Sequence, residues 1–124
     1  MSKPDGWDEN QVVVSTTIQN KRGAVMSYEN LLVEENNGIA ILKINRPKAL
    51  NALNSDLIGE LETFLDECRQ SKTLRCVIIT GNSEKAFVAG ADIKEFVGLN
   101  TAGARKLAER GQAISQKMEA LPQP

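Results

Sequence analysis

The sequence predicts an α/β fold, because strand-like and helix-like apolar patterns alternate along it. Residues 39–44 and 76–79 are short apolar runs of strand length. Between them, apolar residues recur every three or four positions from Leu57 to Cys68, which is the spacing of one helix face. With 124 residues the chain is long enough for one domain of ordinary size.

The composition argues against several functional classes. The formal net charge is −1, with lysines and arginines scattered among acidic residues, so nucleic-acid binding is not expected. The sequence contains no histidine, which removes Ser-His-Asp and Cys-His schemes of catalysis and most zinc sites. No metal is therefore expected. Acid–base chemistry must come from carboxylates, lysine, tyrosine or groups outside this chain.

The cysteines and the apolar stretches indicate where in the cell the protein is expected. Cys68 and Cys76 do not form a CxxC pair, and we expect both to be buried and reduced. No apolar stretch approaches the roughly 20 residues that cross a bilayer, so no membrane association is expected. Residues 1–25 lack the apolar core of a signal peptide. These features predict a cytoplasmic protein.

The first elements follow a polar start. Residues 1–25 show almost no strand or helix period, so we expect a disordered leader or extension there and a domain over 26–124. Leu31 and Val33 alternate with polar or exposed neighbours, as in a strand. The run 36–38, Asn-Asn-Gly, predicts a hairpin, and the β-branched run 39–44 predicts a strand covered on both faces.

A helix and a third strand come next. Pro47 interrupts the strand pattern, and Asn54 or Ser55 can cap a helix. The apolar stripe of that helix consists of Leu57, Ile58, Leu61, Phe64, Leu65 and Cys68. Residues 76–79 predict a buried strand, closed by the turn residues 80–82.

The last third of the chain predicts two more helices. Asp92 and Glu95 have the three-residue spacing of a capping box, so a short helix should begin at Asp92. A longer helix is expected from Thr101, ended by Pro122 and Pro124. Its apolar side comprises Ala104, Leu107, Ala108, Gly111, Ile114, Met118 and Leu121.

The segment 87–95, Phe-Val-Ala-Gly-Ala-Asp-Ile-Lys-Glu, carries the chemistry. Small residues at 89–91 let another group approach the backbone closely. A helix that begins at Asp92 places unpaired N–H groups nearby, which suits an oxyanion. On the residues alone, a tight strand-to-helix connection with a capping aspartate is the favoured explanation of the segment.

Three blocks of sequence then resemble the crotonase (enoyl-CoA hydratase/isomerase) family. They are NRPKALNAL at 45–53, VIITG at 77–81 and KAFVAGADIKE at 85–95, and their order and spacing both agree with that family. The similarity runs from about Met26 to the end of the chain. It implies an incomplete crotonase-type ββα spiral, the N-terminal half of that domain.

The resemblance also implies site residues. The backbone N–H of Ala91 corresponds to the first of two oxyanion-hole donors for a thioester carbonyl. The residues implied along the pantetheine arm and near the adenine of coenzyme A are Lys48, Ala49, Leu50, Ala89, Gly90, Ala91, Asp92, Ile93 and Lys94. Coenzyme A is part of the substrate, so no separate cofactor is expected. Lys94 is equally well explained as an exposed helix lysine.

The implied activity is hydration of a trans-2-enoyl-CoA to a 3-hydroxyacyl-CoA, a lyase reaction of the fatty-acid β-oxidation type. The alternatives are a non-catalytic or truncated CoA-thioester-binding fragment and another family activity such as enoyl-CoA isomerisation. In the family, the second donor and the catalytic glutamates follow the position of Pro124. We therefore expect this fragment alone to be inactive, and the parent enzyme to be a homo-oligomer, a trimer or hexamer.

Overall fold

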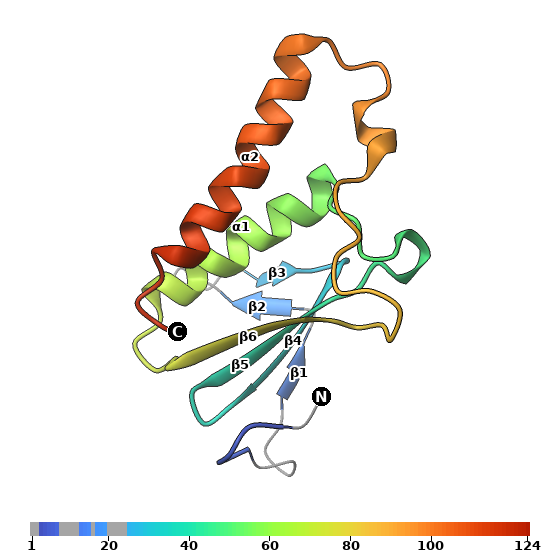
Figure 1. Cartoon of the computed structure of the whole chain (residues 1–124). Helices are drawn as coiled ribbons and strands as arrows, with labels where there is room; N and C mark the ends of the chain where they lie inside the picture. The colour runs from blue at the N-terminus through green and yellow to red at the C-terminus, as the bar shows by residue number, and fades with distance from the viewer. Residues whose placement is uncertain (1–2, 8–12, 16, 20–24) are drawn as a thin grey trace.

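The computed structural model describes residues 3–7, 13–15, 17–19 and 25–124. It confirms the α/β fold, with a sheet on one side and two long helices on the other (Figure 1). The four-stranded sheet has the order β1 (Val13–Ser15), β4 (Leu31–Asn36), β5 (Ile39–Ile44), β6 (Cys76–Gly81), and β2 (Thr17–Gln19) pairs with β3 (Val25–Ser27). The helices are α1 (Ser55–Gln70) and α2 (Thr101–Glu119), with short 3₁₀ helices η2 (Pro47–Ala49) and η3 (Ile93–Phe96).

The predicted hairpin joins β4 to β5. The two strands are antiparallel, and Asn36 lies opposite Ile39. The turn residues Asn37 and Gly38 have φ values of 48° and 81°, the left-handed conformation that a two-residue hairpin loop needs. A side chain on Gly38 would also lie 2.9 Å from the Thr73 carbonyl oxygen. Both conditions explain glycine at this position.

Strand β5 is one of the two inner strands of the sheet, in keeping with its β-branched sequence. Ala40, Leu42 and Ile44 belong to the main core cluster. Ile39 and Ile41 are also buried although they lie outside that cluster, which confirms that both faces of β5 are covered. β5 pairs in parallel with β6, and α1 makes the crossover between them, as parallel pairing requires.

Helix α1 forms where the apolar stripe predicts it. The Asn54 side chain caps the helix and accepts a hydrogen bond from the Leu57 N–H at 2.9 Å. Every residue of the predicted stripe is buried: Leu57, Ile58, Leu61, Phe64, Leu65 and Cys68. Burial raises the pKa of the Cys68 thiol to about 12, so this cysteine stays protonated and unreactive.

The strand predicted at 76–79 is present, but the prediction that it is buried is wrong. β6 extends from Cys76 to Gly81, and all six residues are half-buried. It is the last strand in the sheet order, so one edge has no strand neighbour among the described residues. There the Pro124 carbonyl accepts a hydrogen bond from the Val77 N–H at 3.0 Å. For the same reason Cys76 is half-buried, although both cysteines are free thiols as predicted.

Helix α2 begins at Thr101 as predicted, and Asn100 caps it by accepting from the Gly103 N–H at 2.8 Å. It lies across α1, on the side away from the sheet (Figure 1). Within this fully described helix only Ile114 is buried. The predicted apolar side is therefore packed much less deeply than that of α1, because α2 packs mainly against α1.

The described parts of the N-terminal segment contact the sheet. The backbone of β1 pairs antiparallel with β4, with Val14 opposite Glu34. The Lys3 ammonium lies 2.6 Å from the Glu34 carboxylate, and Lys43 approaches the same group at 2.6 Å. The expectation that residues 1–25 lie apart from the fold is thus at odds with Lys3 and β1. Residues 1–2, 8–12, 16 and 20–24 lie outside the described residues.

Candidate functional site

Two loops with sequence motifs lie side by side at one end of the sheet. The loop 45–53 follows β5, and the loop 82–92 follows β6. Leu53 and Ala91 form an isolated parallel bridge. The Leu53 N–H donates to the Gly90 carbonyl at 2.8 Å, and the Asp92 N–H donates to the Leu53 carbonyl at 2.7 Å. These bonds fix the backbone on both sides of Ala91.

This pairing leaves the Ala91 amide free. In a parallel bridge of this kind, Leu53 bonds to the residues before and after Ala91, so the N–H of Ala91 points away from Leu53. In the described part of the chain no group accepts a hydrogen bond from it, and Ala91 is exposed. Gly90 has φ 103°, a conformation that glycine adopts without strain. The bend at Gly90 therefore presents an unpaired backbone donor.

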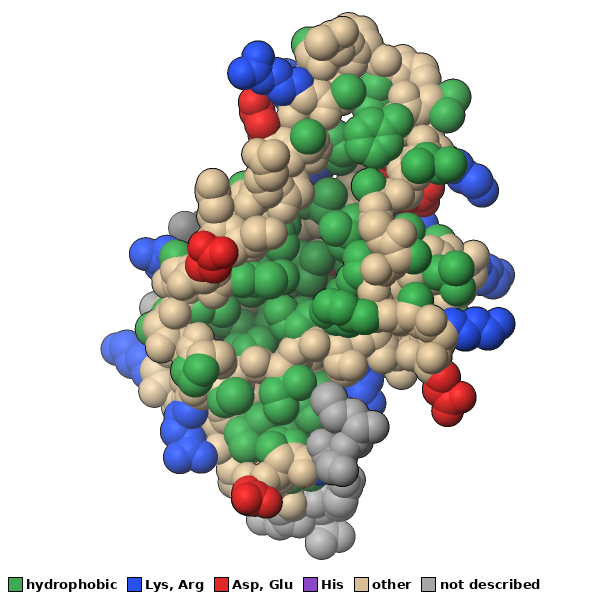
Figure 2. Space-filling model, in the orientation of Figure 1, with side chains coloured by type: hydrophobic (Ala, Val, Ile, Leu, Met, Phe, Trp, Pro, Cys, Tyr) green, Lys and Arg blue, Asp and Glu red, His purple; other side chains and the backbone are tan. Residues whose placement is uncertain are grey.

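An apolar hollow of about 320 Å³ has Ala91 in its lining. Figure 2 shows hydrophobic side chains gathered between α2 and the segment that carries Ala91. The hollow is lined by Leu53, Ile58, Ala91, Phe96, Leu107, Ala108, Gly111, Gln112 and Ser115. Of the predicted binding residues only Ala91 is among these. A carbonyl group placed against the Ala91 N–H would therefore have apolar side chains next to it.

Asp92 caps a helix as predicted, but the prediction that Glu95 completes a capping box is wrong. The element is the four-residue 3₁₀ helix η3, and the Lys94 N–H donates to the Asp92 carboxylate at 3.1 Å. Glu95 does not reach back to Asp92, because the Asp92 N–H already donates to Leu53. Instead the Glu95 carboxylate accepts from the Ser55 N–H at 3.3 Å and from the Ser55 hydroxyl at 3.2 Å. It thereby ties η3 to the start of α1.

Arg46 and Asn51 join the two loops, a role that the sequence did not predict. The Arg46 guanidinium lies 3.3 Å from the Asp92 carboxylate and also donates to the Ala52 carbonyl. The fully buried Asn51 side chain accepts from the Arg46 N–H at 2.8 Å and donates to the Ala86 carbonyl at 3.1 Å. The resemblance placed both residues in a motif, but only tertiary contacts reveal which groups they hold.

The charge of Asp92 is stabilised by these contacts. The hydrogen bond from the Lys94 N–H and, after it, the Arg46 guanidinium lower the pKa of the Asp92 carboxyl below its ordinary value. Asp92 is therefore ionised at neutral pH. The attraction to Arg46 is present above the ordinary pKa of an aspartate and is lost as the pH falls through the lowered value.

The other predicted binding residues lie on the loop surfaces. Lys48 and Ala49 belong to η2, with the Lys48 side chain exposed. Leu50 has φ 51° and is 46% exposed, and its carbonyl accepts from the Ala89 N–H at 3.1 Å. Ile93 is 79% exposed, and Lys94 is exposed beside it. The structure thus brings the 48–50 and 89–94 segments to one side of the molecule.

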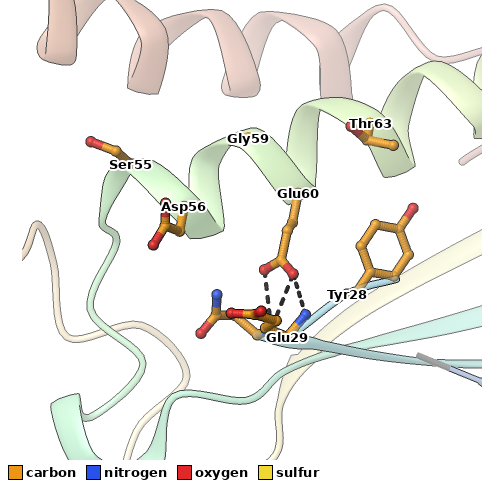
Figure 3. Close-up of a pocket in the computed structure, with 8 residues that line it drawn as sticks. Tyr28, Glu29, Ser55, Asp56, Gly59, Glu60 and Thr63 are labelled. Atoms are coloured by element: carbon orange, nitrogen blue, oxygen red, sulfur yellow. Dashed lines mark hydrogen bonds between the residues drawn. The ribbon is translucent and has the colours of Figure 1, made fainter. Parts of the chain in front are cut away.

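A second hollow, of about 490 Å³, lies between α1 and the start of β4. Figure 3 shows the Glu60 side chain directed at the backbone near Glu29. The Glu60 carboxylate accepts from the backbone N–H groups of Glu29 and Asn30. Carboxylates of Glu29, Asp56 and Glu60 line this hollow, so it does not suit an anionic ligand. The apolar hollow beside Ala91 is the better candidate site.

Metal-binding clusters and membrane-spanning helices are both absent from the described residues. Nowhere in them do three or more histidine, cysteine, aspartate or glutamate side chains gather in a way that could hold a metal ion. None of their helices combines the length and the apolar character that a membrane crossing requires.

Comparison with known proteins supports the resemblance. The family model for enoyl-CoA hydratase/isomerase matches residues 34–124. The chain is 41% identical over 99 residues to a short-chain-enoyl-CoA hydratase of Clostridium acetobutylicum, covering 80% of this chain and 38% of that protein. It is 39% identical over 99 residues to a crotonyl-CoA hydratase of Syntrophomonas wolfei, with the same two coverages of 80% and 38%.

Solved structures confirm the fold. A crystal structure of an enoyl-CoA hydratase from Bacillus anthracis superimposes with a TM-score of 0.75 at 34% identity, covering 77% of this chain and 38% of that one. The Pseudomonas aeruginosa protein AtuE gives a TM-score of 0.73 at 30% identity, covering 77% of this chain and 38% of its own. The chain therefore spans less than two fifths of each of these four proteins, as expected for a partial domain.

Proposed function

This chain belongs to the enoyl-CoA hydratase/isomerase family, and we propose that it supplies the thioester-binding part of an enoyl-CoA hydratase. The observation that carries the proposal is that Ala91, whose N–H is free in the described residues, lines an apolar hollow. A bound enoyl thioester would place its carbonyl oxygen on this donor and its apolar chain in the hollow.

The chemistry explains why a backbone donor is useful here. Hydration of a trans-2-enoyl-CoA adds the oxygen of water to C3 and a proton to C2. Between these events negative charge develops on the thioester oxygen. A preorganised N–H group stabilises that charge, and loss of one such donor typically costs about 3 kcal/mol of barrier. The donor needs no reactive side chain, which suits an alanine.

The rest of the ligand would extend over the paired loops. We propose that residues 48–50 lie along the pantetheine arm and that residues 89–94 line the adenine end. Exposed Lys48 and Lys94 put positive charge on this side, where it would attract the phosphates of coenzyme A. The side-by-side arrangement of the two segments supports this path, since one extended ligand can contact both.

We further propose that this chain alone binds the thioester without turning it over. In the described residues, no acidic side chain lines the hollow beside Ala91. General acid–base help is typically worth about 10²–10⁴-fold per group. Hydration of crotonyl-CoA by the purified chain, followed by the absorbance of the enoyl thioester, should not exceed the rate without protein. Turnover at a rate typical of an enzyme would contradict this view.

Binding itself tests the main proposal. Titration of the ¹⁵N-labelled chain with crotonyl-CoA should shift the Ala91 amide resonance, and the same titration with free coenzyme A should not. Ala91→Ser keeps the N–H and should bind similarly, whereas Ala91→Pro deletes it and should lose the preference for the thioester. Circular dichroism on the same samples controls for unfolding. A folded Ala91→Pro variant with unchanged preference would remove Ala91 from the site.

A further inference from the structure

We propose that Arg46 is a positioning residue for the Ala91 N–H and acts through Asp92, an inference that rests on the proposed function above. Arg46 makes no contact with the apolar hollow, since it is not among the residues that line it. Its effect on a ligand would therefore pass through the loop that presents Ala91.

The contacts of Arg46 reach both sides of the bridge between the two loops. One guanidinium nitrogen donates to the carbonyl of Ala52, the residue before Leu53. The other lies 3.3 Å from the carboxylate of Asp92, the residue after Ala91. Leu53 pairs with Ala91, so the planar guanidinium of Arg46 binds both the residue before Leu53 and the residue after Ala91. A guanidinium suits this task, since its donors have a fixed geometry.

Burial makes this arrangement more rigid than a surface ion pair. The side chains of Arg46 and Asp92 are each 17% exposed, so water competes for them less than for the exposed pairs on the helices. Both carboxylate oxygens of Asp92 are engaged, one by Arg46 and the other by the Lys94 N–H. Asp92 is thus held on two sides, which restricts the peptide that links it to Ala91.

Asn51 fixes the orientation of Arg46 in turn. Its buried side chain accepts a hydrogen bond from the Arg46 N–H and donates to the Ala86 carbonyl. Gly81 packs against the same group, because a side chain there would lie 2.9 Å from the Asn51 amide nitrogen and 2.7 Å from the Ala86 carbonyl oxygen. Arg46 is therefore anchored at its backbone and at its guanidinium, with the Ala91 loop attached to both ends.

The experiment compares four versions of the 124-residue chain: the unmodified chain, Arg46→Met, Asp92→Asn and Arg105→Met. Asparagine is as good a helix cap as aspartate, so Asp92→Asn removes the charge and leaves η3 capped. Arg105→Met is the matched control, because the ion pair that Arg105 forms with Glu109 lies on the exposed side of α2. For each chain the dissociation constants of crotonyl-CoA and of free coenzyme A are measured, together with the Ala91 amide shift and the melting temperature.

The quantity that tests the proposal is the preference for the thioester. It is the dissociation constant of free coenzyme A divided by that of crotonyl-CoA. Loss of a well-placed hydrogen bond corresponds to about a threefold to tenfold fall in this ratio. We expect that fall, with a smaller Ala91 shift, in Arg46→Met and Asp92→Asn and not in Arg105→Met. Arg46 acting only on stability would lower the melting temperature and leave the ratio of the folded protein unchanged, which would overturn the proposal.

The two proposals can fail separately. If crotonyl-CoA does not shift the Ala91 resonance of the unmodified chain, the proposed function is wrong and the role of Arg46 with it. If the unmodified chain responds, but Asp92→Asn keeps its full thioester preference, only the role of Arg46 is wrong. Should Arg46→Met not fold, the thioester preference of Asp92→Asn alone decides whether the role of Arg46 holds.

Discussion

The two long helices have the same kind of N-terminal cap but are buried to different extents. Asn54 caps α1 and Asn100 caps α2, each by accepting from an N–H three residues on. Yet α1 buries six residues within 16, whereas α2 buries only Ile114 within 19. The difference shows that a local cap and an apolar stripe define where a helix forms, while its packing partners define how much it contributes to stability.

The partners explain the contrast physically. α1 lies directly on the sheet and contributes six buried residues to the core, more than any other element, whereas α2 touches that core mainly through Ile114 and a few half-buried side chains. Leu107, Ala108 and Gly111 on the apolar side of α2 line the hollow that also contains Ala91. A helix that leaves apolar surface open in this way suits a binding site better than a core. The expected consequences can be tested by making matched substitutions in both helices.

The largest difference should come from leucine truncation. Leu61 on α1 is 2% exposed, so Leu61→Ala should lower the free energy of unfolding by about 3 kcal/mol through lost burial and a cavity. Leu107 on α2 is only half-buried, and Leu107→Ala should cost about 1 kcal/mol or less. Urea denaturation of both variants measures this. Equal losses would mean that α2 is packed as deeply as α1.

The helix caps should have a smaller effect. Asn54→Ala and Asn100→Ala each remove one side-chain bond to a backbone N–H, typically worth about 1 kcal/mol. We expect the full loss in global stability for Asn54→Ala. Asn100→Ala should instead increase amide hydrogen exchange in the first turn of α2 with little change in global unfolding. A global loss of the same size in both would show that the helices unfold as one unit.

Glycine replacements should act in the opposite direction. Gly59 in α1 has room for a methyl group, whose nearest neighbour would be Arg110 at 3.6 Å, and Gly111 in α2 has none within 4 Å. Alanine at a helix interior position is favoured by about 0.5–1 kcal/mol over glycine. Gly59→Ala should raise the melting temperature more than Gly111→Ala, because more of the fold depends on α1. A lower melting temperature for Gly59→Ala would contradict this packing.

The smallest effect should be at the charged contact between the helices. Lys117 on α2 lies 2.6 Å from Asp66 on α1, and their side chains are 38% and 55% exposed. Exposed ion pairs are typically worth less than about 1 kcal/mol. Lys117→Met should therefore change stability by only a few tenths of a kcal/mol and lose even that in high salt. A larger change would show that this pair, rather than Ile114, holds α2 in place.

Prediction from sequence succeeded where the signals are local. The hairpin at 36–38, the stripe of α1 and the start of α2 at Thr101 depend on turn residues, spacing and caps, and all three are confirmed. Prediction from sequence failed where the outcome depends on a strand or side chain that is distant in the sequence. The burial of β6 depends on whether a strand lies beside it, and the partner of Glu95 depends on which groups Asp92 has already bonded.

The sequence by itself determined the family and the positions of the β4–β5 hairpin, α1 and the start of α2, because motif spacing, apolar periodicity and capping residues are properties of short segments. Only the tertiary structure decided that the Ala91 N–H is free, since this follows from the pairing of Leu53 with the residues on either side of it. It also revealed that Arg46 holds Asp92 and that Asn51 holds Ala86. These contacts join residues at least 35 positions apart, and the strength of such bonds depends on geometry and burial that no local pattern contains.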